Sequence, residues 1–247
     1  MVAFPSISEE KTIAEIVSEN FKTAEVFKRN GIDFCCGGKK PLKQVCEEKE
    51  LNEEKLVQEL NEVITGNQVK PEDDFAHWHL QTLIDHIVSK HHKYVLDNLG
   101  LIAEFADKVA RVHGDHSPET IKIAELWHTL SDELTFHLRK EEQILFPYVA
   151  QMLEVEEEHK HLGIPGFQTV QNPIRAMEFE HDNAGDIIKE IQHLSNNFTP
   201  PEWACNTYKV LYFKLQEFQN DLFNHIHLEN NILFPKAIEL EKKLSAF

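Results

Sequence analysis

A histidine and a glutamate four residues apart occur twice in this sequence, each time ahead of the same short segment. The first copy is His137-Leu-Arg-Lys-Glu141 and the second is His225-Ile-His-Leu-Glu229, and Ile-Leu-Phe-Pro follows both at the same offset. Because residues four apart share one face of an α-helix, each copy directs an imidazole and a carboxylate toward one point. Two such helices facing each other in a bundle would make a site for two metal ions.

Two further histidines interrupt the apolar stripes of two other predicted helices. His92 precedes the first copy of the motif, and His181 lies between the two copies. Their separation along the chain equals that of His137 and His225 to within one residue, so the predicted bundle consists of two similar halves. The stripes follow the alternating steps of three and four that mark one helix face. The stripe around the first copy reads Ile123, Leu126, Leu130, Leu134, His137, Glu141 and Ile144.

Six polar side chains inside one bundle need a strong partner. Burying an ionised carboxylate without compensation costs roughly several kcal/mol or more. The predicted ligands suit two iron ions with both carboxylates bridging; they are His92, His137, Glu141, His181, His225 and Glu229. Ferritin-like bundles use Glu-x-x-His instead, so the sequence predicts a different class of bundle.

Long helices must position these side chains. Glycine is scarce, at nine residues, and almost no segment alternates apolar and polar residues as a strand does. The four helices that we expect cover about 77–112, 117–158, 172–196 and 199–243. Pro147 and Pro235 should end or bend their helices one turn past the ligands, because proline lacks a backbone N–H.

The predicted fold is all-α, with a small N-terminal three-helix domain followed by the four-helix bundle. The expected bounds are 1–66 for the small domain, 67–75 for a linker and 76–247 for the bundle. A three-helix unit of this size is marginal alone. It would therefore lean on the bundle or on a partner subunit, and the second option suits a homodimer.

Composition excludes several functions. The formal net charge of −17 argues against nucleic acid and anionic membranes as partners. No apolar run approaches the roughly 20 residues needed to cross a bilayer, and the first residues do not form a secretory signal. We therefore expect a cytoplasmic protein. The four cysteines lack zinc-type spacing, and a disulfide scaffold is improbable in such a chain.

Other acidic and histidine residues lie beside the predicted ligands. Glu133, Asp221 and Glu180 could orient imidazoles or carry protons, or they could be ordinary surface charges. His86 lies at the inner edge of its helix and is a weaker candidate for orienting a ligand. The remaining histidines are expected on solvated surface, namely His77, His79, His91, His113, His116, His128, His159, His161, His193 and His227.

A second motif gives a resemblance to a known family. The run Asp33-Phe34-Cys35-Cys36-Gly37-Gly38, followed by this bundle, resembles the iron–sulfur cluster repair proteins of the RIC (YtfE/ScdA) type, which carry a hemerythrin-like domain. The runs Glu141-Glu-Gln-Ile-Leu-Phe-Pro147, Glu180-His181-Asp182 and Asn197-Phe-Thr-Pro-Pro201 also match that family. The resemblance covers nearly the whole chain. One departure is Phe34, which stands where a tyrosine can occur.

The resemblance implies a non-haem di-iron centre with oxo and carboxylate bridges, held by the six ligands given above. It implies repair of iron–sulfur clusters in client proteins after nitrosative or oxidative stress, with the protein as iron donor, and reactivity toward NO. Glu133 and Glu180 match the family's channel and outer carboxylates. With two histidines per iron, positions should remain for NO or O₂.

Other functions stay open at this point. The alternatives are a hemerythrin-like carrier or sensor of O₂ or NO, an enzyme that reduces NO to N₂O, a di-iron oxidase or peroxidase, and a metal-free scaffold. Whether the chain is an enzyme is therefore undecided.

The adjacent pair Cys35 and Cys36 is a further candidate site. Their side chains should diverge, which makes an ordinary chelate awkward, while Gly37 and Gly38 permit positive φ and close approach. Exposed thiols near two lysines would have lowered pKa values. The functional hypothesis, which rests mainly on the resemblance, is thiol redox chemistry or handling of iron or NO; the alternative is a tight turn with two small buried residues. The other two cysteines, Cys46 and Cys205, are expected to be packing residues.

Overall fold

The computed structural model describes residues 7, 8, 10–66, 73–159 and 162–245. Within these residues the regular secondary structure is helical, apart from one isolated β-bridge between Thr12 and Pro41. The predicted all-α class is therefore confirmed. Part of the expected linker, 67–72, lies outside the described residues. The described helices include no stretch that is both long and apolar enough to cross a bilayer.

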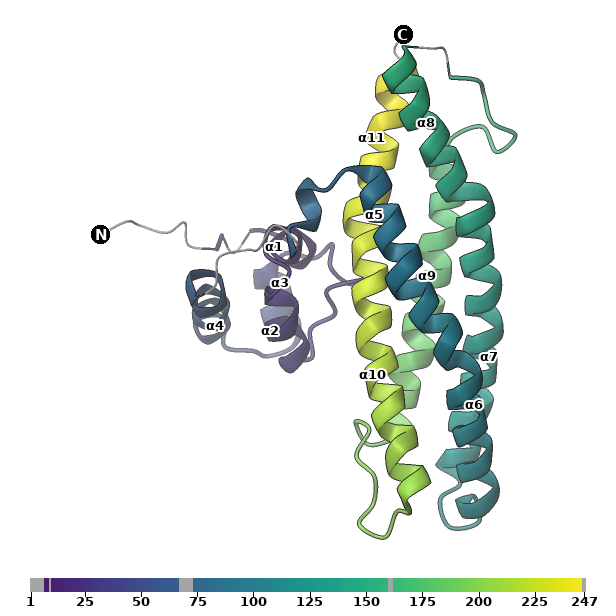
Figure 1. Cartoon of the computed structure of the whole chain (residues 1–247). Coiled ribbons are helices and arrows are strands. Elements are labelled where there is room, and N and C mark those ends of the chain that lie inside the picture. Colours follow the sequence, from purple (N-terminus) through teal and green to yellow (C-terminus); the bar gives the residue numbers. More distant parts are fainter. Residues whose placement is uncertain (1–6, 9, 67–72, 160–161, 246–247) are drawn as a thin grey trace. The chain divides into compact units, whose positions relative to one another are not determined.

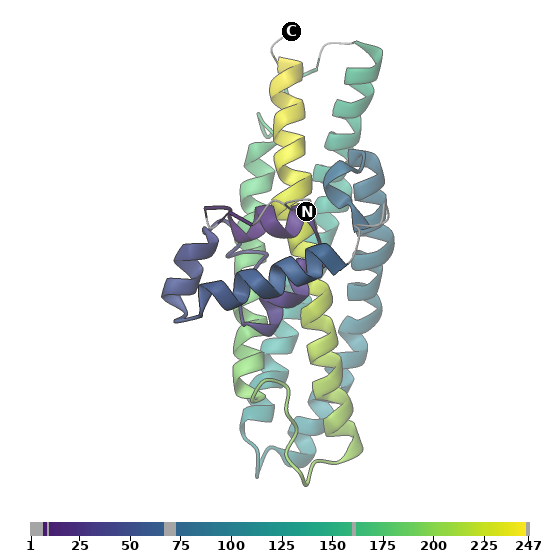
Figure 2. The same cartoon turned by 90° about the vertical axis from the view of Figure 1, so that its left-hand side faces the viewer.

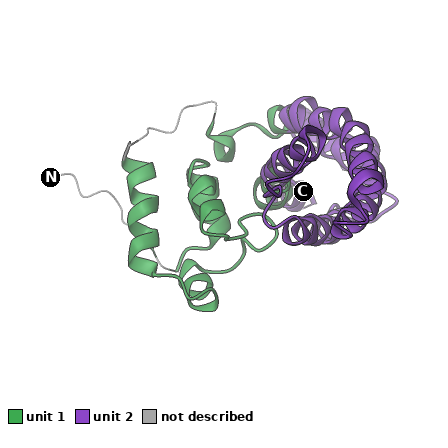
Figure 3. Cartoon of the chain, turned by 90° about the horizontal axis from the view of Figure 1, so that it is seen from below, with its two compact units in different colours: residues 1–83, 226–236 green, residues 84–225, 237–247 purple. Residues whose placement is uncertain are grey.

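The chain divides into two compact units (Figure 3). One unit comprises residues 1–83 together with Ile226–Lys236, and the other comprises Ile84–His225 together with Ala237–Phe247. A segment from the end of the chain therefore belongs to the same unit as the N-terminal helices. The sequence did not predict that this segment would pack with the N-terminal helices.

The N-terminal unit contains one more short helix than expected. Its helices are α1 (Ile13–Glu19), α2 (Thr23–Arg29), α3 (Leu42–Glu48), α4 (Glu53–Gly66) and the 3₁₀ turn η2 (Phe75–His77). Helix α1 begins with a capping box, in which Thr12 and Glu15 satisfy each other's backbone N–H groups. The additional helix is α3, whose Leu42 is fully buried together with Ile13 and Phe27.

Figure 1 shows long helices that run side by side, and most of their residues belong to the other unit. They are α5 (Leu80–His86), η3 (Ile87–His92), α6 (Lys93–His113), α7 (Glu119–Lys140), η4 (Glu141–Leu145), α8 (Phe146–Glu158), α9 (Gln171–Leu194), α10 (Asn206–Leu228), η5 (Glu229–Leu233) and α11 (Phe234–Ser245). Figures 1 and 2 show the last three as one continuous column in the chain's final colours.

Three π-helical turns interrupt these long helices at predicted ligands. His92 ends η3, Glu141 begins η4 and Glu229 begins η5. A π-turn adds one residue to a helical turn and often occurs at functional sites. It therefore changes which side chains after it face inward.

The prolines do not end their helices. Pro147 is in the first turn of α8, directly after η4, and Pro235 has the same place in α11. In the first turn of a helix the missing N–H of proline costs little. The chain accordingly stays helical as far as Glu158 and Ser245.

The π-turn η4 also explains one wrong prediction. Ile144, expected on the inner stripe, has a side chain that is 48% exposed. Its neighbour Leu145 is 1% exposed and takes the inward position. The extra residue of the π-turn moves the stripe by one position.

An apolar layer supports the ligand-bearing helices of the long bundle. Trp127 is fully buried on α7, and its indole N–H donates to the carbonyl of Leu99 at 3.1 Å. Its ring packs edge-on against Phe218 of α10, with ring centroids 4.7 Å apart. Such aromatic contacts contribute to stability beyond the buried area alone.

A buried carboxylate ties the start of α9 to the last helix. Glu241 of α11 is 8% exposed and accepts hydrogen bonds from the Tyr148 hydroxyl at 3.0 Å and from the Val170 N–H at 2.8 Å. It also accepts from the Thr169 hydroxyl. The segment before α9 is thus fixed by one side chain.

Replacing this carboxylate should destabilise the long unit. Glu241→Ala leaves three donors without their acceptor, so we expect the free energy of unfolding to fall by about 2–4 kcal/mol. Glu239→Ala, which removes an exposed carboxylate from the same helix, should change it by less than about 0.5 kcal/mol. Urea denaturation measures both; equal effects would contradict this role of Glu241.

Candidate metal centre

The predicted ligands meet in two groups of donor atoms that share both glutamates. The first group is His92, Glu141, His225 and Glu229, and the second is His137, Glu141, His181 and Glu229. In each group one donor atom per residue lies within 4.8 Å of the others. All six side chains are buried.

The distances are those of ligands arranged around common points. Oε2 of Glu141 lies 3.4 Å from Nε2 of His92 and 3.3 Å from Nε2 of His137. The Nε2 atoms of His137 and His181 are 3.0 Å apart. Two nitrogens at right angles on one metal, with bonds of about 2.1 Å, would be about 3 Å apart. One oxygen of Glu141 thus lies near a histidine of each group.

Burial supports the fit of these residues to metal ions. Glu141 and Glu229 are both 0% exposed. Two ionised carboxylates in an apolar interior need positive charge nearby, and divalent ions supply it. The donor set of imidazole nitrogen and carboxylate oxygen is one that iron, zinc and manganese accept.

Two carboxylates outside the donor groups hold ligand rings in place. Nδ1 of His92 hydrogen-bonds Oε1 of Glu142 at 2.7 Å, and Nδ1 of His137 hydrogen-bonds Oε2 of Glu180 at 2.9 Å. Each ring therefore donates from Nδ1 and keeps Nε2 for a metal. The His137 hydrogen bond, together with Lys140, lowers the pKa of Glu180 to about 2.

Sequence reasoning found Glu180 but missed Glu142. Glu142 directly follows the ligand Glu141, and in a regular α-helix adjacent side chains point about 100° apart. The π-turn that begins at Glu141 lets both carboxylates approach His92, one at each ring nitrogen. Glu133, the other expected carboxylate, has an exposed side chain on α7.

His91 is a second residue that sequence reasoning misplaced. It was expected on the surface, yet its side chain is 3% exposed. Its Nδ1 hydrogen-bonds Oδ1 of Asp221 at 2.9 Å, and its ring stacks on His225 with centroids 5.6 Å apart. Asp221 therefore orients His91, while His86 lies at the other edge of the same ring, 5.6 Å away.

His227 was also wrongly expected on the surface. It is 0% exposed within the N-terminal unit, where it packs against the rings of Phe21 and Phe34. Burial lowers the pKa of His227 to about 4, so the ring is neutral near pH 7. The misplacement arose because segment 226–236 packs with helices from the other end of the chain.

The paired cysteines lie in a loop that is fixed against this same segment. Asn231 donates from Nδ2 to the carbonyl of Cys35 at 3.3 Å, and the carbonyl of Phe34 is 3.4 Å away. Gly38 is required for close approach, because a Cβ there would lie 2.5 Å from the carbonyl oxygen of Phe34. Positive φ, the other expected reason for the two glycines, is not found at Gly37 or Gly38.

Cys35 differs from the exposed thiol of lowered pKa that was one of our expectations. Cys35 is 1% exposed, and its thiol lies 3.2 Å from Oδ1 of Asp33 and 3.9 Å from the sulfur of Cys36. Burial, with these neighbours, raises the pKa of Cys35 well above its usual value. Cys46 is buried as expected, whereas Cys205 is exposed and lies 3.3 Å from Nε2 of His113.

Comparisons with known proteins agree with both motifs. The hemerythrin HHE cation-binding domain matches residues 83–237, and a domain of unknown function called ScdA_N matches residues 9–64. The probable iron-sulfur cluster repair protein of Haemophilus influenzae is 35% identical over 87% of this chain and 90% of its own length. The iron-sulfur cluster repair proteins YtfE of Citrobacter koseri and of Escherichia coli K12 are each 35% identical over 93% of this chain and 97% of their own lengths.

Removing the charge beside His92 should weaken metal binding. Glu142→Gln keeps the shape of the side chain but replaces the carboxylate with a weaker acceptor, so we expect metal affinity to fall by about 10–100-fold. The matched control is Glu190→Gln, which neutralises an exposed carboxylate on α9 and should leave affinity unchanged. Competition with a chelator measures both variants with Fe²⁺; equal affinities would show that Glu142 has no such role.

Proposed function

This chain belongs to the family of iron-sulfur cluster repair proteins, and we propose that it restores damaged clusters by donating iron from a centre of two non-haem iron ions. The relatives that carry this name match nearly the whole chain, including both domains. The observation that carries the proposal is the pair of buried donor groups that share Glu141 and Glu229.

Each iron would be held by two histidines and by both bridging glutamates. His92 and His225 would serve one ion, and His137 and His181 the other. Four protein donors per ion are fewer than the six of an octahedral site. When bound, the iron pair would supply open coordination positions for small molecules such as NO or O₂ and a store of transferable iron.

The surroundings of the donor groups support a site from which iron can leave. Glu142 touches His92 and is 40% exposed, and Glu180 touches His137 and is 31% exposed. One histidine of each donor group is therefore hydrogen-bonded to a carboxylate that reaches solvent. These two hydrogen bonds fix the orientation of the His92 and His137 rings. Loss of either bond would let its ring turn and would weaken its hold on a metal ion.

We further propose that the damage repaired is nitrosative or oxidative and that the clients are other iron–sulfur proteins. A centre with open positions is accessible to NO and O₂, so it would be exposed to the same agents that damage clusters. The protein's negative charge, −17, favours association with cations such as iron ions.

Mixing the iron-loaded protein with an NO-damaged [4Fe–4S] enzyme tests the proposal. We expect the enzyme to regain activity while the protein loses iron in proportion. His225→Leu should bind less iron and repair less, because one ion keeps only one imidazole, whereas Glu190→Gln should repair like the wild type. The thermal unfolding of each iron-free variant checks that it is folded.

Two results would contradict this function. One is reversible O₂ binding by the iron-loaded protein with no recovery of the damaged enzyme, which would favour a carrier or sensor. The other is equal recovery with iron-free protein, which would show that iron transfer is not involved.

A further inference from the structure

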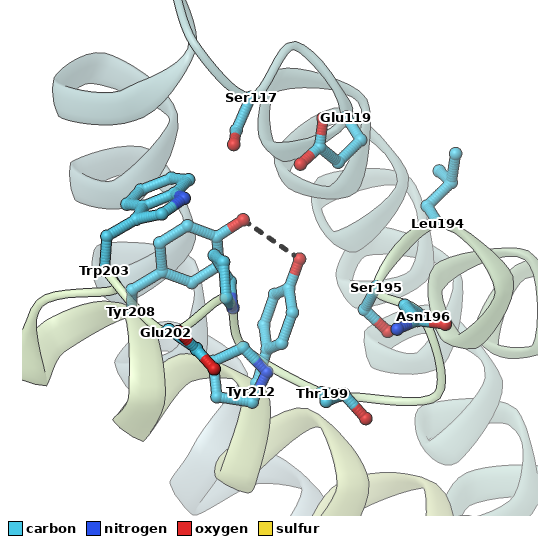
Figure 4. A pocket seen from close by; sticks show the side chains of 12 residues that line it. Ser117, Glu119, Leu194, Ser195, Asn196, Thr199, Glu202, Trp203, Tyr208 and Tyr212 are labelled. Carbon is cyan, nitrogen blue, oxygen red and sulfur yellow. Dashed lines mark hydrogen bonds between the residues drawn. The ribbon is translucent and has the colours of Figure 1, made fainter.

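A pocket of about 350 Å³ opens where the start of α7, the end of α9 and the start of α10 meet (Figure 4). None of its lining residues is a predicted metal ligand. Its lining includes Thr199, Pro200 and Pro201, which belong to the family-like run Asn197-Phe-Thr-Pro-Pro201. The proposed repair function gives this pocket no role.

Three aromatic rings form one side of the pocket. Tyr208 and Tyr212 are 0% and 2% exposed, and their hydroxyl groups are 3.2 Å apart. Trp203 is 56% exposed and meets the ring of Tyr208 edge-on, with centroids 5.9 Å apart. Of the three rings, only the indole of Trp203 exposes much of its surface, and the two tyrosines pack behind it.

The charge of the lining is negative only. Glu119 and Glu202 are its charged residues, and no lysine, arginine or histidine lines it. Neither glutamate forms an ion pair with a lysine or arginine in the part of the chain that the structure describes. Figure 4 shows the Glu119 carboxylate directed toward the hydroxyls of Tyr208 and Tyr212. Burial raises the pKa of both tyrosines, and Glu119 contributes to this shift.

The turn between α9 and α10, which contributes Asn196 to the lining, has a left-handed backbone. Asn196, Asn197 and Phe198 are three consecutive residues with φ of 48°, 54° and 57°. Residues with a Cβ rarely adopt this left-handed region, and runs of them are rarer still. The buried Phe198 side chain and a 3.0 Å hydrogen bond from its N–H to the Ser195 hydroxyl hold the turn in place. Strained backbone of this kind is concentrated at ligand sites.

We propose that this pocket binds a small organic cation of the alkylammonium class. The exposed indole of Trp203 attracts such cations through the negative charge of its ring face, and the carboxylates of Glu119 and Glu202 supply a counter-charge. An anion would be repelled by Glu119 and Glu202, and a neutral ligand would leave their charge uncompensated. The inference is independent of the metal centre, since it rests on other residues.

Glu119 also lies in the first turn of α7, where an acidic residue stabilises the helix. That role explains an acidic residue at this position, but it does not require three aromatic side chains, a second glutamate and a left-handed turn around one cavity. The net charge of −17 would attract cations weakly everywhere, so the test must separate this pocket from general attraction.

The probe is tetramethylammonium chloride, titrated into the full iron-loaded protein while tryptophan fluorescence and heat are recorded at constant ionic strength. tert-Butanol, which has a similar shape and no charge, is the matched probe. We expect saturable binding of one tetramethylammonium per chain with a Kd of about millimolar or tighter, and no saturable binding of tert-butanol.

Variants locate the site. Glu119→Gln should weaken tetramethylammonium binding by about tenfold or more, whereas Glu125→Gln, an exposed position on the same helix, should change it by less than about twofold. Glu202→Gln, at an exposed position, is a second test in case Glu119→Gln unfolds, which thermal denaturation would reveal. The proposal is overturned by non-saturating binding up to about 50 mM or by equal weakening in Glu119→Gln and Glu125→Gln.

Discussion

The structure depends on two carboxylates in the centre of a helical bundle. Glu141 and Glu229 are 0% exposed, and each belongs to both donor groups. The desolvation of two negative charges is too costly to persist without positive charge. This requirement accounts for the four histidines around them, since imidazole nitrogens and bridging carboxylates together suit metal ions. It also explains why such polar residues interrupt helix faces that are otherwise apolar.

Helix geometry and outer hydrogen bonds adapt the bundle to these charges. A π-turn occurs at three of the ligands, where it adds a residue and changes the direction of the next side chains. Glu142 and Glu180 then orient one ring each, and Asp221 orients His91, which stacks on His225. The two halves of the site are alike in ligands but differ in these neighbours. The two donor groups are therefore not equivalent.

Much of this site could be predicted from the sequence, because the His-x-x-x-Glu repeat and the matched spacing of His92 and His181 follow from helix periodicity alone. The features that periodicity could not predict arise from departures from regular helix geometry or from packing between segments that are far apart in the sequence. Glu142 and Ile144 were misjudged because a π-turn leaves no pattern in the sequence. The burial of Cys35 and His227 arises from the packing of segment 226–236 with the N-terminal helices, which no local pattern reveals. The third short helix of that unit, α3, was missed because few apolar residues mark it.

We propose that the six buried residues hold two metal ions, and anomalous diffraction at the iron absorption edge, from crystals of the iron-loaded protein, is the direct test. We expect two peaks, each about 2.1 Å from two imidazole nitrogens, with His92 and His225 at one and His137 and His181 at the other. Iron peaks only at surface residues, or no peak among the six, would contradict it.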